Sequence, residues 1–179
     1  MSTSSLDLLS AGHRAVIRAL DELVAGAWTG YSAYWYTRGV RGDWSVKDLV
    51  SLLAAYERLL VDVLGALEEP RPTPVLDRYC ADAERFAQRE ILHRRDRSIG
   101  EVLYEYEAMH DEARRLIARL PVELRRRSGL IAWYGAEADL DDLLLDRYYG
   151  YKRELAAQIE AFGRHLQRVL EARDTGAAA

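Results

Sequence analysis

Four long stretches of the chain carry apolar residues at every third or fourth position, and this pattern restricts the fold more than any other feature. The stretches cover about residues 6–27, 45–67, 98–120 and 139–172. Such spacing places apolar side chains along one side of an α-helix, and helices of this kind bury that side against one another. No stretch shows sustained strand-like alternation. The sequence therefore predicts one all-α domain over residues 1–179, a four-helix bundle with an ordered core of about 6–172.

Polar residues mark the start of two of these helices. Ser45 with Asp48, and Ser98 with Glu101, have the spacing of capping boxes, in which each side chain bonds the other residue's backbone N–H. We therefore expect the second helix to begin at Ser45 and the third to begin after Ser98.

Prolines divide the chain between the helices. Those at 70, 72 and 74 predict an extended linker. A short extra helix is then expected over Leu76–His93. Pro121 ends the third helix, and Pro121–Ala138 is predicted to be a loop that carries Trp133 and Tyr134.

An aromatic connection, WTGYSAYWYTRGVRGD, joins the first two helices over residues 28–43. Its glycines interrupt regular structure, although part of it has room for a short helical turn. The connection is either a lid or dimer surface over one end of the bundle, or one wall of a pocket for a planar small molecule. Its candidate ligand-binding residues are Trp28, Tyr31 and Trp35.

Composition and charge narrow the class of protein. The net charge of −4 gives no reason to expect nucleic acid as a partner, and no apolar run approaches the ~20 residues of a membrane span. One cysteine and an N-terminus unlike a signal peptide predict a cytoplasmic protein. The basic clusters Arg94–Arg97 and Arg125–Arg127 are interpreted as solvated surface.

Several polar residues lie on the apolar sides of the predicted helices. His13 and His110 are either hydrogen-bonded core residues or a general acid and base facing a shared cavity. Tyr56, Tyr148 and Tyr151 either bond nearby groups or line a polar spot inside the bundle.

Metal-binding patterns are weak in this sequence. No two histidines lie four residues apart, and Glu107-x-x-His110 occurs once where di-iron bundles need two such motifs. No metal and no cofactor is predicted.

Two segments resemble the DinB-like superfamily of helical bundles. They are Gly42–Glu57 (GDWSVKDLVSLLAAYE) and Asp146–Ile159 (DRYYGYKRELAAQI). The middle of the chain, Glu84–Glu90 and Arg97–Leu103 followed by Trp133–Gly135, is most similar to the ClbS/DfsB family, named after a colibactin self-protection protein. The resemblance implies a DinB-like four-helix bundle with a central cavity.

The resemblance also implies where chemistry would occur. Metal-binding members carry histidines at positions that fall on Leu52, Tyr151 and Leu155, and two aliphatic side chains and a phenol do not hold a divalent cation. In the self-protection branch the position aligned with Leu52 holds a tyrosine implicated in opening a cyclopropane with water.

Two hypotheses of function follow. In the first, the protein binds or transforms a hydrophobic small molecule, electrophilic or not, without a metal, as in self-protection or hydrolysis. In the second, it is a non-catalytic bundle, either a single chain or a homodimer, whose metal cavity is refilled by apolar side chains. For the first, the candidate catalytic residues are Tyr56, Tyr151, His13 and His110, and the candidate ligand-binding residues are Trp28, Tyr31, Trp35, Leu52, Trp133, Tyr134, Tyr148 and Leu155.

Overall fold

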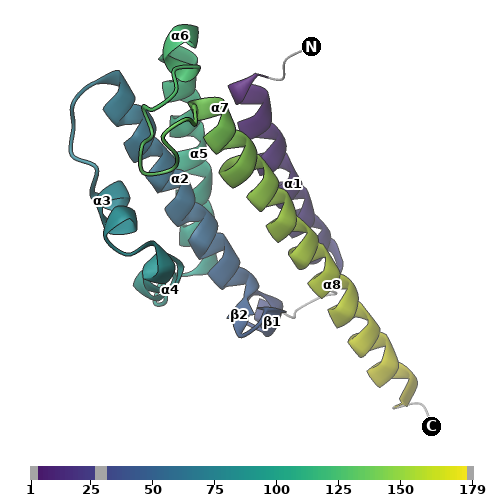
Figure 1. Ribbon diagram of the computed structural model, residues 1–179. Coiled ribbons are helices and arrows are strands. Elements are labelled where there is room, and N and C mark those ends of the chain that lie inside the picture. The colour runs from purple at the N-terminus through teal and green to yellow at the C-terminus, as the bar shows by residue number, and fades with distance from the viewer. Residues whose placement is uncertain (1–3, 27–31, 177–179) are drawn as a thin grey trace.

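A computed structural model describes residues 4–26 and 32–176 (Figure 1). Two candidate ligand-binding residues, Trp28 and Tyr31, lie outside these described residues. The described chain is mostly helical, which confirms the all-α class. No helix in the described ranges is both long and apolar enough to cross a membrane.

Four long helices make up the body of the molecule: α1 (Ser5–Gly26), α2 (Val46–Glu68), α5 (Ile99–Arg119) and α8 (Tyr151–Gly176). They correspond to the four predicted stretches. The helices pack as two close pairs, α1 with α8 and α2 with α5, whereas α2 and α8 touch little. Figure 1 shows α1 alongside α8, and α5 behind α2.

Both predicted capping boxes are confirmed. Ser45 Oγ accepts from the Asp48 backbone N–H at 3.2 Å, and Asp48 Oδ2 accepts from the Ser45 N–H at 2.8 Å. Ser98 and Glu101 form the same reciprocal pair at the start of α5. These boxes satisfy backbone donors that the first turn of a helix otherwise leaves unpaired.

The prediction of a single helix over Leu76–His93 is wrong. The structure has two helices, α3 (Pro74–Ala81) and α4 (Ala83–His93), with Asp82 between them. Asp82 ends α3 and caps α4, because its carboxylate accepts from the Arg85 N–H at 3.2 Å. Pro74 belongs to α3 rather than to an extended linker, since a proline at the first helical position gives up no helical hydrogen bond.

The aromatic connection contains strands that the sequence did not predict. After a 3₁₀ turn, η1 (Ser32–Trp35), strands β1 (Arg38–Arg41) and β2 (Trp44–Ser45) pair antiparallel. Gly39 and Gly42 have φ values of 111° and 57°, which only glycine adopts readily. The hairpin is too short to show strand alternation in the sequence.

The last predicted helix is continuous, but it changes from α-helical to π-helical geometry and back. It begins with α7 (Leu140–Leu143), capped by Asp139, and passes through a π-helical turn, η2 (Leu144–Gly150), into α8. A further short helix, α6 (Val122–Arg125), lies within the predicted loop. The π-helical turn sets the direction of the side chains that follow it, beginning with Tyr151.

The prediction of solvated surface is wrong for part of the basic cluster Arg94–Arg97. Arg94 is 3% exposed and lies between Glu90 and Glu105, with ion-pair distances of 2.8 Å to each. Arg97 also pairs with Glu105. Since α3 and α4 bury few apolar residues, these ion pairs are a main link between α4 and α5.

Candidate functional site

Two charged residues interrupt the apolar sides of α2 and α8 at the same level of the bundle. Glu57 is 0% exposed and Lys152 is 1% exposed. The Lys152 ammonium donates a hydrogen bond to Glu57 Oε1, so a buried ion pair joins α2 to α8. Burying two charges is costly unless they are paired and hydrogen-bonded.

Two histidines and a tyrosine extend this pair into a polar cluster, defined here as His13, Glu57, Tyr106, His110 and Lys152. His110 Nδ1 lies 3.4 Å from Glu57 Oε1. The imidazole of His13 stacks on that of His110, with ring centroids 3.8 Å apart and planes 6° apart. Tyr106 lies beside His13, with centroids 5.1 Å apart. Each of the four long helices contributes at least one member.

Burial and neighbouring charge set the protonation of the cluster. Burial lowers the pKa of His13 to about 3, with the nearby His110 and Lys152 acting in the same direction. Burial also lowers the pKa of Lys152, although the charge of Glu57 opposes that shift. Burial alone would raise the pKa of Glu57, but the Lys152 charge and the approach of His110 bring it below the ordinary value. Burial and Glu57 raise the pKa of Tyr106.

The polar cluster has unused hydrogen-bonding capacity. Within the described part of the chain, four of its buried atoms have no hydrogen-bond partner: His13 Nδ1, Glu57 Oε2, the Tyr106 hydroxyl and His110 Nδ1. Buried polar atoms in proteins are nearly always partnered, and exceptions concentrate at functional positions. His13 also lines a shallow surface hollow of about 620 Å³ between α1 and α8.

A second constellation, the aromatic face, consists of Tyr56, Tyr79, Phe86, Trp133 and Tyr151. Tyr56 and Tyr151 meet edge to face, with centroids 5.6 Å apart. Phe86 lies 5.7 Å from Tyr56 and 5.2 Å from Tyr79, and Tyr79 lies 5.3 Å from Trp133. All but Phe86 are only partly buried, so part of each of these four residues remains exposed.

Polar groups accompany these rings. The Arg41 guanidinium donates to the Tyr151 hydroxyl at 3.1 Å and lies 5.7 Å above the Trp44 ring. Burial raises the pKa of Tyr56 to about 12, helped by Tyr151, so its phenol is neutral at ordinary pH and can donate a hydrogen bond. Tyr148 instead donates to the Tyr56 carbonyl oxygen at 2.9 Å, one of the structural roles expected for it.

The four candidate catalytic residues fall into two separate pairs. His13 and His110 belong to the polar cluster, and Tyr56 and Tyr151 to the aromatic face. The two constellations are linked through the sequence, because Tyr56 directly precedes Glu57 and Tyr151 directly precedes Lys152. Neighbouring positions on a helix differ in direction by roughly 100°.

The other candidate ligand-binding residues are placed as follows. Trp133 belongs to the aromatic face, and Tyr134 lies beside it while donating to Asp146 at 3.0 Å. Trp35 packs against Tyr34 and the core between α1, α2 and α8. Leu52 and Leu155 are both 0% exposed.

Lys152, Tyr106 and Glu57 were not among the site residues predicted from the sequence. The spacing of Glu57 and Lys152 relative to apolar residues did indicate that both charges would be buried. Glu57 lies four residues after Leu53 and three before Leu60, and Lys152 lies four after Tyr148 and three before Leu155. A charge on an otherwise apolar side predicts a buried partner.

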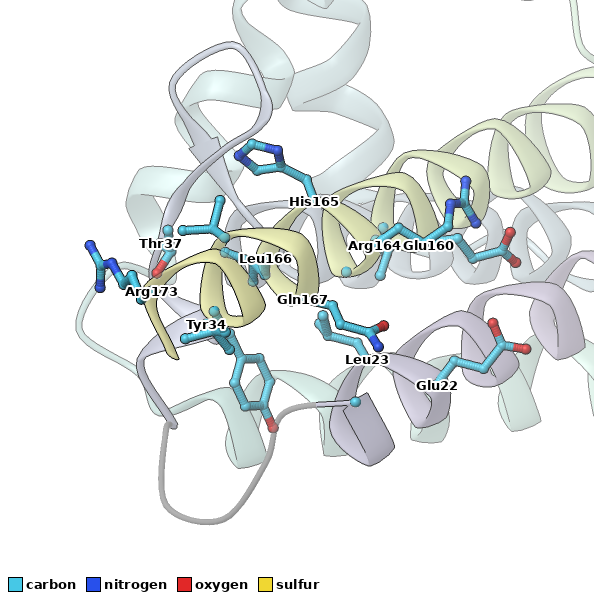
Figure 2. A pocket seen from close by; sticks show the side chains of 15 residues that line it. Glu22, Leu23, Tyr34, Thr37, Glu160, Arg164, His165, Leu166, Gln167 and Arg173 are labelled. Atoms are coloured by element: carbon cyan, nitrogen blue, oxygen red, sulfur yellow. The ribbon is translucent and has the colours of Figure 1, made fainter. Parts of the chain in front are cut away.

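A groove of about 390 Å³ lies elsewhere, where α8 runs past the end of α1. In Figure 2, Tyr34 and Leu23 border it, with Glu22 and Glu160 towards the bundle and Arg173 at the far end. None of its described lining residues was a candidate from the sequence.

Among the described residues, no three His, Cys, Asp or Glu side chains are arranged to hold a metal ion. No protein-family model, curated protein or solved structure matches the chain.

Proposed function

We propose that this chain is a metal-independent, DinB-like helical bundle protein, closest to the ClbS/DfsB family, that binds a planar hydrophobic small molecule at the aromatic face. The ligand would lie against Tyr56 and Tyr151, on helices that belong to different pairs of the bundle. The resemblance suggests an electrophilic ligand, and self-protection or hydrolysis as the outcome.

The observation that carries this proposal is the combination of accessible rings with polar groups. Aromatic side chains offer large, rigid contact area, and a few polar groups fix the orientation of a ligand in such a site. Here α2, α3, α4, α8 and the loop before α7 supply rings whose centroids lie 5.2–5.7 Å from their neighbours. The Tyr56 phenol and the Arg41 guanidinium supply hydrogen-bond donors beside them.

Ligand binding tests the proposal. Titration with 2-naphthol is expected to quench tryptophan fluorescence, because Trp133 belongs to the aromatic face. Tyr56→Phe keeps the ring and removes one donor, so the dissociation constant should rise about 3- to 10-fold, the effect of one hydrogen bond. Tyr104→Phe is the matched control, because Tyr104 is 76% exposed on α5, and its dissociation constant should equal that of the unmodified protein.

One result would count against the proposal. If naphthol and a panel of other aromatic compounds neither quench the fluorescence nor raise the melting temperature, the aromatic face is not a ligand site.

A structural role is the second candidate function. It is favoured by Leu52 and Leu155, which are both 0% exposed and fill the family's metal-ligand positions with apolar side chains. In this case the aromatic rings serve to hold α3 and α4 against α2. Failure of every ligand, together with dimer formation measured by sedimentation, would favour this function.

A further inference from the structure

Arg41 lies at the edge of the aromatic face. Its guanidinium donates to the Tyr151 hydroxyl at 3.1 Å, and its central carbon lies 5.8 Å from the centre of the Tyr151 ring and 5.7 Å from that of the Trp44 ring. Strand β1, which carries Arg41, packs against α8, which begins at Tyr151. Contacts with two rings therefore hold an exposed cation in a defined place beside the aromatic face.

Most of the hydrogen-bonding capacity of Arg41 is unused. A guanidinium has five N–H donors and no acceptor. One N–H group donates to Tyr151, and within the described ranges no carboxylate lies within ion-pair distance of Arg41. The charge of Arg41 therefore has no direct counter-charge there, and its remaining donors can bind an anionic group.

A second cation acts on the same part of the molecule. Arg147 lies 5.9 Å from the centre of the Tyr134 ring, which is next to Trp133 of the aromatic face. The charges of Arg147 and Arg41 both act to lower the pKa of Tyr56, although burial has the larger effect and raises it. Both cations are therefore close enough to influence a charge placed beside the Tyr56 phenol.

The acidic side chains nearby do not cancel this positive charge. Asp146 lies 3.5 Å from Arg147 and forms an ion pair with it. Glu154 acts to raise the pKa of Tyr151, but the charge of Arg41 acts in the opposite direction and more strongly. The cations therefore outweigh the carboxylates beside the tyrosine hydroxyls.

The two tyrosine hydroxyls add hydrogen-bond donors of their own. Tyr151 accepts from Arg41, so its own hydrogen is free to donate. Tyr56 is protonated at ordinary pH, because its pKa is about 12. A carboxylate only accepts hydrogen bonds, and it bonds most strongly to donors that carry a positive charge. An aromatic ring that bears a carboxylate matches both the rings and the donors.

We propose that the ligand of the aromatic face is an aromatic carboxylate, whose ring lies against Tyr56 and Tyr151 and whose carboxylate pairs with Arg41. The inference rests on the proposed function, and it names the charge of the ligand and the residue that selects it. A guanidinium can donate two parallel hydrogen bonds to one carboxylate, so Arg41 sets the orientation of the ligand as well as its charge. The same aromatic compound without a negative charge lacks this pairing and binds more weakly.

Two ligands of the same shape test the proposal on the unmodified protein. 2-Naphthoate and 2-naphthamide differ in the charge of one group, and calorimetric titration gives a dissociation constant for each. The constant for naphthoate should be about tenfold lower, the effect of one charge-assisted pairing. Equal constants, or tighter binding of naphthamide, would overturn the proposal without the need for a variant.

Arg41→Gln assigns the preference to one side chain. The preference for naphthoate over naphthamide should fall to about twofold or less in this variant. Arg38→Gln is the matched control, because Arg38 is exposed on the same strand and its loss changes the net charge by the same amount. The control should keep the full preference. A preference that survives in Arg41→Gln, or that disappears equally in both folded variants, contradicts the pairing with Arg41.

Competition shows whether the aromatic ring is needed. Acetate carries the charge without the ring, so it should displace naphthoate far less effectively than benzoate does. Equal displacement by the two anions would show that Arg41 binds any small carboxylate, and would overturn the aromatic class of the ligand.

The outcome is separable from the proposed function. Binding of 2-naphthol that depends on Tyr56, with no preference for naphthoate over naphthamide, would overturn the carboxylate and leave the ligand site standing. Absence of binding for all three compounds would overturn both.

Discussion

His13 shows how position inside the bundle changes the chemistry of one residue. Its imidazole is covered by His110 and Tyr106 of α5, and faces Lys152 of α8 and Glu57 of α2. Glu57 is already paired with Lys152. A proton added to His13 would therefore bring a positive charge with no free counter-charge beside it, and the folded protein keeps this imidazole neutral.

The stability of the fold should depend on pH through His13. Its pKa is about 3 in the folded chain against an ordinary value of 6.5, so between these values the unfolded chain binds a proton that the folded chain does not. The free energy of unfolding should fall as pH falls through this window, in total by about 5 kcal/mol. Urea unfolding between pH 7 and pH 5 should show about 2 kcal/mol of this loss before ordinary carboxylates titrate.

Two variants isolate this effect. His13→Phe keeps a ring on His110 and removes the ionisable group, so the slope should flatten. His165→Phe, at an exposed position of α8, should keep the slope of the unmodified protein. Equal slopes in all three proteins would refute the assignment to His13.

At the scale of elements, ion pairs hold α4 against the bundle, whereas apolar packing holds the long helices together. Only Phe86 and Glu90 of α4 are buried. Glu90 bonds Arg78 of α3 and Arg94 at the end of α4, and Arg94 also bonds Glu105 of α5. Glu105 further accepts from Arg58 of α2, so one network joins α2, α3, α4 and α5.

Removing the Arg94 side chain should break the link between Glu90 of α4 and Glu105 of α5. Arg94→Leu leaves two buried carboxylates without their shared partner, and we expect a loss of about 3 kcal/mol or more in the free energy of unfolding. Arg95→Leu is the matched control, since the Arg95 side chain is 72% exposed, and it should change stability by less than about 0.5 kcal/mol. Chemical denaturation followed by circular dichroism measures both, and equal losses would contradict this role of Arg94.

At the scale of the whole molecule, two helix pairs meet along a boundary that the polar cluster crosses. Lys152–Glu57 and His13–His110 each join the α1/α8 pair to the α2/α5 pair. The aromatic face lies on the same boundary, since Tyr56 and Tyr151 come from opposite pairs. The close approach of α1 to η2, the turn that leads into α8, depends on Gly12, where a Cβ atom would collide with the backbone carbonyl oxygen of Tyr148.

Gly12→Ala should therefore force α1 away from η2. Because the obstacle is backbone rather than a movable side chain, we expect a loss of about 2 kcal/mol in stability. Gly100→Ala is the control, since nothing lies within 4 Å of its added Cβ, and it should stabilise α5 by about 0.5 kcal/mol. Thermal unfolding of both proteins measures the difference, and a neutral Gly12→Ala would show that the helices do not need this close contact.

Whether a structural feature could be predicted depends on how far apart in the sequence its interacting residues lie. The four long helices and both capping boxes were predicted, because they depend on residues three or four positions apart. The break at Asp82, the hairpin and the burial of Arg94 were not. Each depends on a contact or backbone conformation that composition and periodicity do not encode, such as the bond from Arg94 to Glu105.

Part of the candidate site could likewise be predicted from the sequence, and part could not. His13, His110, Tyr56 and Tyr151 could be chosen from the sequence, because each lies on the apolar side of a predicted helix. Their division into two pairs, and the presence of Lys152 beside Glu57, required the tertiary structure. Those two residues are 95 positions apart in the chain, and only the packing of α2 near α8 brings them together.

By itself, the sequence determined the class of fold, the helices and the residue types available for chemistry, since periodicity and capping act within one or two helical turns. The tertiary structure alone decided the pairing of α1 with α8 and of α2 with α5, and with it which charges are buried, which atoms lack partners and which pKa values shift. These properties depend on desolvation and on charges brought close by distant parts of the chain, so they exist only once the helices have packed.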